Sequence, residues 1–533
     1  MLDLLIRGGR VVDGTGNPWY RADVGIQGGR IVALGRLGGE SAHRTIDADG
    51  LCVSPGFVDM HAHSDLTLLA DPTWEVKLMQ GVTLELLGQD GLSLAPVSDE
   101  TRAVLHDQLM SWNGPGPGVQ RTWFGISEYL NRFDGQVAPN VATLVGHGTV
   151  RMLVMGLDDR APTADELTRM QAVVVQALKE GAVGLSAGLT YAPAMYSDDD
   201  ELVALCQAMR PYGGHYQPHQ RSYGKNLLEA YRDSIEIGRR AGVAVHLTHA
   251  HMGYRVNKGR AAELLALVDR YRAEGVEVTM DTYPYTAGST YLHASLPGWV
   301  SAGGAVATLS RLRDPAIRER IRNEMEEGAD GFHGMPIEWS ALVIASVSQE
   351  RHQGYVGSSI QEAAARAGQD PFEFYCDLLI EEQLQVGSLW FVGNEENVEA
   401  ILQHPAHTAG SDGIVFGGRP HPRAWGTFAR YLGEMVRKRG LVRLEEMVRH
   451  MTSLPCQRLG FFDRGIIRVG MAADVVCFDA AQVLDTATYE QPRAYPTGIP
   501  YVLVNGVVVK DLDRHTGALP GRALRRVAAP AER

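Results

Sequence analysis

Short apolar runs and longer amphipathic segments alternate through the middle of the chain. The runs are rich in Val, Leu and Ala, and the segments between them, such as 198–210 and 226–240, carry apolar residues every three to four positions. This alternation predicts β-α-β units and therefore a parallel sheet covered by helices. The runs that we expect to be strands are 55–59, 82–87, 141–145, 182–186, 243–248 and 276–281.

The number of these units favours one architecture over another. So many units over about four hundred residues favour a closed (β/α)8 barrel of the TIM type, with an open, doubly wound sheet as the alternative. The Gly-x-Gly-x-x-Gly pattern of a dinucleotide-binding fold is absent from this region. Residues from about 290 to 345, with a helical pattern at 314–327, do not resemble a standard unit. We therefore expect a small insertion there.

Both ends of the chain differ from the middle in sequence pattern, because they contain strand-like runs separated by turns. The first fifty residues hold β-branched runs separated by Gly8-Gly9, Asp13-Gly14 and Gly28-Gly29. Near the end, Asn505-Gly506 lies between two apolar runs, which is a strong signal for a β-hairpin. We therefore predict a small β-sandwich built from residues 1–55 and 466–515, around a barrel that spans residues 56–465.

Composition narrows the class of protein. The 533 residues are 45% hydrophobic and carry a formal net charge of -13, which argues against nucleic-acid partners and anionic membrane surfaces. The five cysteines are scattered without a Cys-x-x-Cys pair, as in a reducing compartment. Neither a signal-peptide pattern nor an apolar run long enough to span a membrane stands out. We expect a cytoplasmic globular protein that acts on a small molecule.

Two histidines directly follow the first predicted barrel strand. His61 and His63 are two residues apart, so on an extended backbone their rings point to the same side. With 18 histidines in the chain, chance alone gives about 0.6 His-x-His pairs, and a second pair, His249 and His251, does exist. The position of the first pair, where a barrel strand ends, makes it a candidate for metal binding.

Further polar residues lie where barrel strands should end. Taken singly, each is best interpreted as an aspartate that caps a turn or as a hydrogen-bonded core histidine. Together they form a plausible set of nitrogen and oxygen ligands for Zn²⁺ or a similar divalent ion. The set consists of His61, His63, Asp90, His219, His249 and Asp412.

Several longer motifs stand out along the chain, at residues 5–16, 55–63, 181–193, 281–289, 410–413, 421–428 and 465–479. They resemble the amidohydrolase superfamily, and within it the N-acyl-D-amino-acid deacylase (D-aminoacylase) family. The resemblance covers nearly the whole chain and implies a (β/α)8 barrel with a small β-sandwich from both termini.

The resemblance implies roles for particular residues. His61 and His63 correspond to metal ligands after the first strand, His219 to the fifth-strand ligand and His249 to the sixth. Asp412 corresponds to an aspartate that binds metal and acts as the catalytic acid and base. Arg423 corresponds to the arginine that holds the substrate carboxylate, with Tyr283 and Ser289 assisting. Tyr191 is expected to face the same pocket.

Two positions depart from the family pattern. Asp90 stands where the family usually has a cysteine that binds metal, and an oxygen ligand holds zinc less selectively than a thiolate. His251 stands where the family has a lysine that meets the substrate, so we expect a shifted substrate preference.

Three functions remain in competition. The first is hydrolysis of the amide bond of N-acyl-D-amino acids, with one or two divalent metal ions. The second keeps the barrel and the metal but acts on another amide, a cyclic amide or a carbamoyl compound, because both departures lie where metal and substrate meet. The third is a catalytically silent scaffold, which only the loss of the cysteine supports.

Overall fold

The computed structural model describes residues 1–328 and 334–526, and its centre is a closed barrel of eight parallel strand positions. Neighbouring strands pair in parallel around the barrel. The backbone N–H of Met60 donates to the carbonyl of Ala409 across 3.0 Å and closes the ring, so the open sheet is excluded. The strands are β6 (Phe57–Asp59), β7 (Val82–Leu87), β8 (Asn140–Thr143) with β9 (Val145–Gly146), β10 (Gly184–Gly188), β11 (His215–His219), β12 (Ala244–Leu247), β13 (Val278–Thr282) and β17 (His407–Ala409).

Strand β11 was not among the predicted strands, because its sequence, His-Tyr-Gln-Pro-His, is polar. The side chain of Gln217 points to polar partners: its amide donates to Gln89 Oε1 at 2.9 Å and to the carbonyl of Met60 at 3.1 Å. All five residues of the strand are buried. Because Gln217 forms hydrogen bonds inside the barrel, a polar residue occupies a core position of this strand, and no apolar pattern reveals it.

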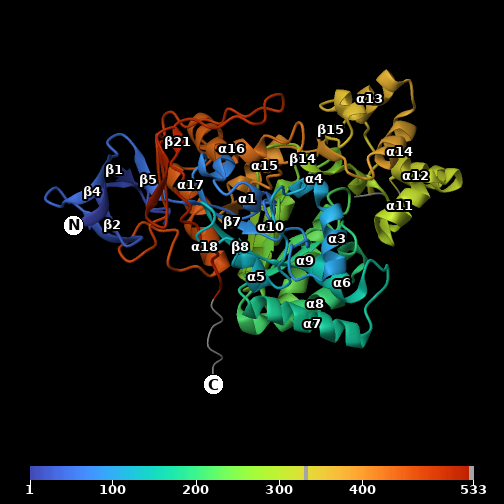
Figure 1. The fold of residues 1–533 in the computed structure, drawn as a ribbon, viewed down its shortest axis with the longest axis horizontal. Coiled ribbons are helices and arrows are strands. Elements are labelled where there is room, and N and C mark those ends of the chain that lie inside the picture. The colour runs from blue at the N-terminus through green and yellow to red at the C-terminus, as the bar shows by residue number, and fades with distance from the viewer. Residues whose placement is uncertain (329–333, 527–533) are drawn as a thin grey trace.

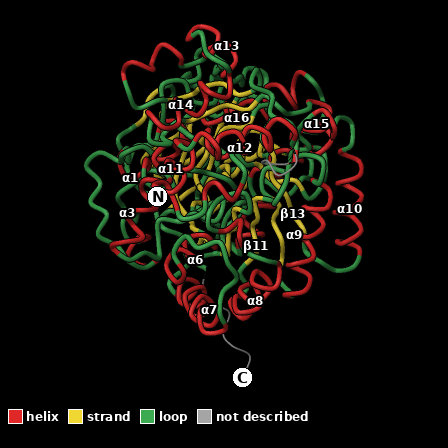
Figure 2. Tube along the Cα trace, turned by 90° about the vertical axis from the view of Figure 1, so that its right-hand side faces the viewer, coloured by secondary structure: helices red, strands yellow, loops and turns green. Residues whose placement is uncertain are grey.

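Helices surround the barrel strands on the outside (Figure 2). Helix α7 illustrates why they form: Thr163 and Glu166 cap its start reciprocally, and one face buries Met170, Val174 and Leu178. The larger barrel helices are α3 (Asp99–Gln108), α6 (His147–Met155), α7 (Ala164–Lys179), α8 (Asp199–Met209), α9 (Leu227–Ala241), α10 (Ala261–Ala273), α15 (Glu395–Leu402), α16 (Arg423–Arg430), α17 (Leu444–Met451) and α18 (Ser453–Leu459), with shorter ones α1 (Thr67–Ala70), α2 (Glu75–Leu78), α4 (Met110–Asn113) and α5 (Ile126–Leu130). Across residues 1–328 and 334–526, no helix is both long and apolar enough to span a membrane.

The insertion between β13 and β17 is longer than the sequence predicted. It builds a three-stranded antiparallel sheet in the order β14-β16-β15, and its helices lie at one end of the molecule (upper right in Figure 1). The predicted range of about 290–345 was too short, because the central strand of this sheet comes only at residues 387–390. Residues 329–333 of that range lie outside the described residues. The elements are β14 (Gly288–Tyr291), α11 (Gly304–Arg313), α12 (Pro315–Glu327), β15 (Leu342–Ser346), α13 (Ile360–Ala367), α14 (Pro371–Glu381) and β16 (Gly387–Trp390).

The two ends of the chain meet in one β domain, as the sequence predicted. Strand β18 pairs antiparallel with β5, so the blue and red strands lie side by side in Figure 1. The expected hairpin at Asn505-Gly506 joins β19 to β20. Gly8-Gly9, however, is not a turn: β1 runs through it with a shift in register. The strands are β1 (Leu2–Val11), β2 (Tyr20–Gln27), β3 (Arg30–Gly35), β4 (Ala42–Asp47), β5 (Cys52–Pro55), β18 (Val475–Phe478), β19 (Tyr501–Val504), β20 (Val507–Asp511) and β21 (Arg514–His515).

Candidate active site

The six predicted metal ligands all lie at or just beyond the carboxyl ends of barrel strands. His61 and His63 follow β6, Asp90 follows β7, and His219 is the last residue of β11. His249 follows β12 and Asp412 follows β17 in the same way. All six are buried. The fold therefore brings together residues that are up to about 350 positions apart in the sequence.

The side chains form two adjoining groups that share Asp90. One group is His61, His63, Asp90 and Asp412, and the other is Asp90, His219 and His249; within each, one potential ligand atom per residue lies within 4.8 Å of the others. His61 Nε2 is 3.3 Å from His63 Nε2, and His219 Nδ1 is 3.0 Å from His249 Nε2. Ring nitrogens that face each other so closely direct their lone pairs at common points.

Asp90 lies at the centre of this arrangement. Its carboxylate oxygens are 3.5–3.8 Å from a ring nitrogen of each of the four histidines, and its buried Oδ1 has no hydrogen-bond partner. Burial alone would raise the pKa of Asp90, but the charge on His61 and the rings of His219 and His249 hold that pKa well below its ordinary value. A buried, ionised carboxylate without a hydrogen bond is costly unless a cation meets it.

The protonation of the histidines differs across the site. Burial lowers the pKa of His219 to about 4, so this ring is neutral near pH 7, the form that binds metal. Burial alone would also lower the pKa of His61, but the charges of Asp412 and Asp90 outweigh it and raise that pKa well above its ordinary value. The carboxylates thus hold a proton on His61 when no other cation is present.

Three of the six residues have left-handed backbone conformations. The φ angles are +52° at Asp90, +28° at His249 and +50° at Asp412. Such a conformation costs a non-glycine residue about 1–3 kcal/mol and persists only where the surrounding structure imposes it. Strain of this kind is common at functional sites, and all three of these residues belong to the two groups of potential ligands.

Arg423 contacts Asp412 at the same carboxylate oxygen as His63 does. It is fully buried; its Nη2 is 3.0 Å from Asp412 Oδ1 and donates to the carbonyl of Ser289 at 3.2 Å. Its guanidinium lies over the ring of Tyr283 at 4.4 Å, and its Nε and Nη1 atoms have no hydrogen-bond partner. A buried guanidinium with unused donors is suited to bind a carboxylate.

A cavity of about 110 Å³ opens onto the two groups of potential metal ligands, and neither His61 nor Arg423 is among the residues that line it. Tyr191 packs against His219 with 4.7 Å between ring centroids, and His251 packs against Tyr283 at 4.2 Å. Burial lowers the pKa of His251 to about 3, so the ring is neutral near pH 7. The predicted residues that line the cavity are His63, Asp90, Tyr191, His219, His249, His251, Tyr283, Ser289 and Asp412.

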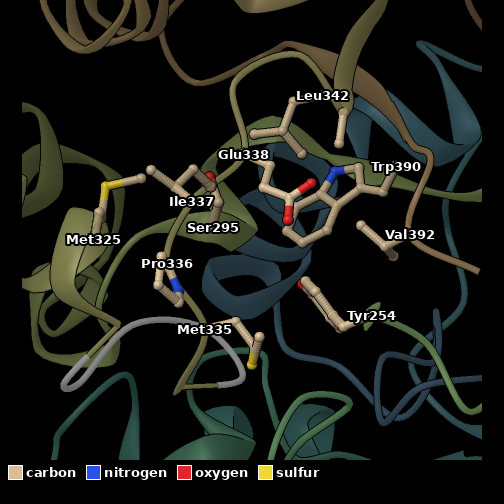
Figure 3. Close-up of a pocket in the computed structure, with 11 residues that line it drawn as sticks. Tyr254, Ser295, Met325, Met335, Pro336, Ile337, Glu338, Leu342, Trp390 and Val392 are labelled. Carbon is tan, nitrogen blue, oxygen red and sulfur yellow. The ribbon is translucent and has the colours of Figure 1, made fainter. Parts of the chain in front are cut away.

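A second cavity adjoins the first but is too small for a substrate. It measures about 20 Å³, enough for about one water molecule. Tyr254, Trp390 and Val392 line both cavities, and Figure 3 shows them facing Met335 and Ile337 of the insertion. The wall of the larger cavity is therefore formed in part by the insertion.

Comparisons with known proteins now identify the family. The profile of the Amidohydrolase family matches residues 44–510. The chain belongs to the amidohydrolase family. It is 36% identical to an N-acyl-D-glutamate deacylase of Alcaligenes xylosoxydans xylosoxydans, over 99% of this chain and 98% of that one.

Solved structures of two relatives superpose on this amidohydrolase. One is the N-acyl-D-glutamate deacylase of Bordetella bronchiseptica, complexed with zinc and a phosphonate mimic of the tetrahedral intermediate: TM-score 0.83, 34% identity, 98% of this chain and 99% of that one. The other is a D-aminoacylase described as having a binuclear metal center: TM-score 0.83, 34% identity, 99% and 100%. The resemblance noted in the sequence is confirmed.

The structure also reveals residues around the site that sequence reasoning missed. The hydroxyl of Thr190 is 2.6 Å from His219 Nε2, and that of Tyr223 is 3.0 Å from His249 Nδ1. Asp281 accepts a hydrogen bond from the backbone N–H of His249 at 2.9 Å and lies 3.8 Å from His61 Nδ1. Such partners orient metal-binding rings. Asp281 could have been found, since it ends a predicted strand; Thr190 and Tyr223 lie in loops and carry no signal.

The donor set of the amidohydrolase fits a divalent cation. It offers neutral imidazole nitrogens and two ionised carboxylates, the ligands that Zn²⁺ takes in catalytic sites. The Asp90 oxygen without a hydrogen-bond partner and the closely spaced histidine nitrogens are both favourable for a cation bound between them. Because Asp90 belongs to both groups, it could contribute a ligand to each of two ions.

Zinc binding to this amidohydrolase should release a proton. Below the raised pKa of His61 the metal-free ring is protonated, and zinc needs the lone pair that this proton occupies. We expect zinc affinity to fall up to about tenfold for each unit of pH decrease in that range. Calorimetry in buffers of different ionisation enthalpy measures the proton directly.

A His61→Asn variant provides the control, because it lacks the titrating ring. It should bind zinc with a weaker dependence on pH. A zinc affinity that stays constant between about pH 6 and 8 in the unmodified chain would contradict this account of His61.

Proposed function

We propose that this amidohydrolase hydrolyses the amide bond of N-acyl-D-amino acids, with one or two divalent ions, Zn²⁺ foremost, and releases a D-amino acid and a carboxylate. One observation carries the proposal: Asp412 Oδ1 is 3.0 Å from His63 Nε2 and also 3.0 Å from Arg423 Nη2. The same carboxylate thus touches the cation site and the anion site. The short distance between the cation site and the anion site suits a substrate whose amide bond lies beside a carboxylate.

The metal ligands in this proposal are the residues of the two groups. His61, His63, Asp90 and Asp412 would hold one ion, and Asp90, His219 and His249 the other. A bound ion lowers the pKa of a water molecule and polarises a carbonyl group. The full-length similarity to deacylases supports this assignment.

Asp412 is the proposed catalytic acid and base. Burial alone would raise its pKa, but the charges of Arg423 and His61 hold the pKa well below its ordinary value, so the carboxylate is ionised near pH 7. It can therefore accept a proton from the attacking water at a carboxylate oxygen. The same oxygen then returns the proton to the amide nitrogen as the amine leaves.

Arg423 is the proposed anchor for the carboxylate of the amino acid, with Tyr283 and Ser289 beside it. The unpartnered Nε and Nη1 atoms of Arg423 support this role. Tyr191 and the neutral ring of His251 would bound the rest of the substrate. Because the anchor and Asp412 are fixed relative to each other, only one configuration at Cα presents its carbonyl correctly.

The rival functions receive less support. A cyclic amide or carbamoyl compound without a carboxylate would leave the buried donors of Arg423 unpaired, which costs free energy. A silent scaffold would have no need for six convergent ligand residues, three of them in left-handed conformations.

The domain boundaries and the cytoplasmic location of the protein are further parts of this proposal. Residues 1–55 with 466–515 would form the β-sandwich and residues 56–465 the catalytic barrel, which agrees with the pairing of β5 and β18. The five buried cysteines are all free, in keeping with a cytoplasmic protein.

A stereoisomer panel tests the reaction. With zinc supplied, N-acetyl and N-formyl derivatives of D-amino acids should be hydrolysed, and their L forms about 100-fold more slowly, because the L carbonyl is misplaced relative to Asp412. Release of the free amino acid is measured for each pair. Hydrolysis of cyclic or carbamoyl amides with no turnover of any D form would overturn the proposal.

The role of Asp412 has its own test. Asp412→Asn keeps an oxygen that can bind metal but removes the proton acceptor, so kcat should fall about 10²- to 10⁴-fold with little change in KM. Zinc content is measured on the same sample. A variant with full zinc content and more than a trace of activity would show that another group transfers the proton.

A further inference from the structure

We propose that Lys77, a fully buried lysine beneath the site, is a positioning residue: through Asp59 and Ser411 it fixes the His61 and Asp412 loops and thereby one of the two metal positions. The inference rests on the metal site of the proposed function and goes beyond it. Lys77 belongs to α2, outside the ligand-bearing loops, and has no exposed side-chain surface.

Lys77 is the centre of a buried network of charges and hydrogen bonds. Its Nζ donates to Asp59 Oδ2 at 2.6 Å and to Ser411 Oγ at 2.5 Å, and it lies 3.7 Å from Glu85 Oε1. Two buried carboxylates thus share one ammonium group. Removal of that group would leave both charges without a cation in a site closed to water.

The network reaches the metal-binding loops through their backbones. Asp59 Oδ1 accepts from the N–H of His61 at 3.2 Å and from the N–H of Ser411 at 2.8 Å. Ser411 Oγ donates to Asp59 Oδ2 at 2.6 Å and accepts from the N–H of Gly413 at 3.1 Å. Asp59 and Ser411 therefore hold the residues on both sides of Asp412.

These hydrogen bonds on both sides of Asp412 matter because Asp412 has a strained backbone. Its φ of +50° is unfavourable for an aspartate and must be imposed by its neighbours. The N–H of Asp412 itself donates to the carbonyl of His61 at 2.8 Å, so the two loops are also joined directly. Lys77, held in place by packing, keeps this pair of loops in register.

The other metal position depends on different contacts. His219 and His249 are oriented by Thr190 after β10, Tyr223 after β11 and Asp281 on β13. The hydrogen bonds of Lys77, Asp59 and Ser411 lead instead to the loops after β6 and β17, and Lys77 also lies 3.7 Å from Glu85 on β7. Disruption of the network should therefore weaken one position and spare the other.

Zinc binding in single-site backgrounds tests the inference. His219→Asn leaves only the position of His61, His63, Asp90 and Asp412 intact. His61→Asn leaves only the position of Asp90, His219 and His249 intact. Into each background we would introduce Ser411→Ala or Lys77→Met and measure zinc affinity by calorimetry on the full chain. Ser411→Ala keeps the Lys77–Asp59 pair, so it still tests the network if Lys77→Met fails to fold.

The chain offers matched controls. Lys510→Met removes another buried lysine, whose Nζ donates to the carbonyl of Met79 at 3.2 Å. Thr408→Val removes a buried hydroxyl on β17 that donates to the carbonyl of Met280 at 3.4 Å. Both controls should leave zinc affinity unchanged in either background.

We expect Ser411→Ala and Lys77→Met to weaken zinc binding about 10- to 100-fold in the His219→Asn background and less than about threefold in the His61→Asn background. Unchanged affinity in the first background, or equal loss in both, would overturn the inference. If the unmodified chain binds no zinc at all, the proposed function fails with it. If zinc binds but no D form is hydrolysed, the proposed function fails alone.

Discussion

Negative charge buried at the mouth of the barrel is the constraint on which the site depends. Asp59, Glu85, Asp90, Asp281 and Asp412 are all buried. Each buried carboxylate costs several kcal/mol unless a cation or donors compensate it. Two basic side chains meet part of this need: Lys77 pairs with Asp59, and Arg423 pairs with Asp412. Asp90 depends instead on exchangeable cations, either the proton on His61 or a metal ion.

The barrel converts this constraint into geometry. Parallel strands end at the same face, so residues after β6, β7, β11, β12 and β17 converge although the chain separates them widely. The hydrogen bonds of the loops then fix left-handed conformations at Asp90, His249 and Asp412 that an isolated peptide would avoid. The rest of the barrel imposes these strained backbone conformations, and the side chains of these residues take part in the two groups of potential ligand atoms.

Much of this arrangement was readable from the sequence. The apolar runs located β7 and β12 almost to the residue, and the ligand candidates stood out because polar side chains directly follow buried strands. The sequence did not predict β11, because the strand places polar residues such as Gln217 inside the barrel, where Gln217 donates to Gln89. The extent of the insertion escaped because β16 pairs with strands that lie about 40 and 100 residues earlier in the chain. Lys77 escaped because nothing in its local sequence distinguishes it from a lysine on an exposed helix.

The need to compensate buried charge also concerns Arg423, the proposed substrate anchor, whose side chain is ordered by contacts within the protein. Its side chain is held by the carbonyl of Ser289, by the ring of Tyr283 and by Asp412, so little rotational freedom is left to lose on binding. Two of its nitrogens remain unpaired in a buried environment, where a hydrogen bond to a carboxylate is strong. Asp412 orders this anchor and also faces the histidines. The distance between the anion site and the cation site is therefore set by one side chain, and that side chain is itself held by the network beneath it.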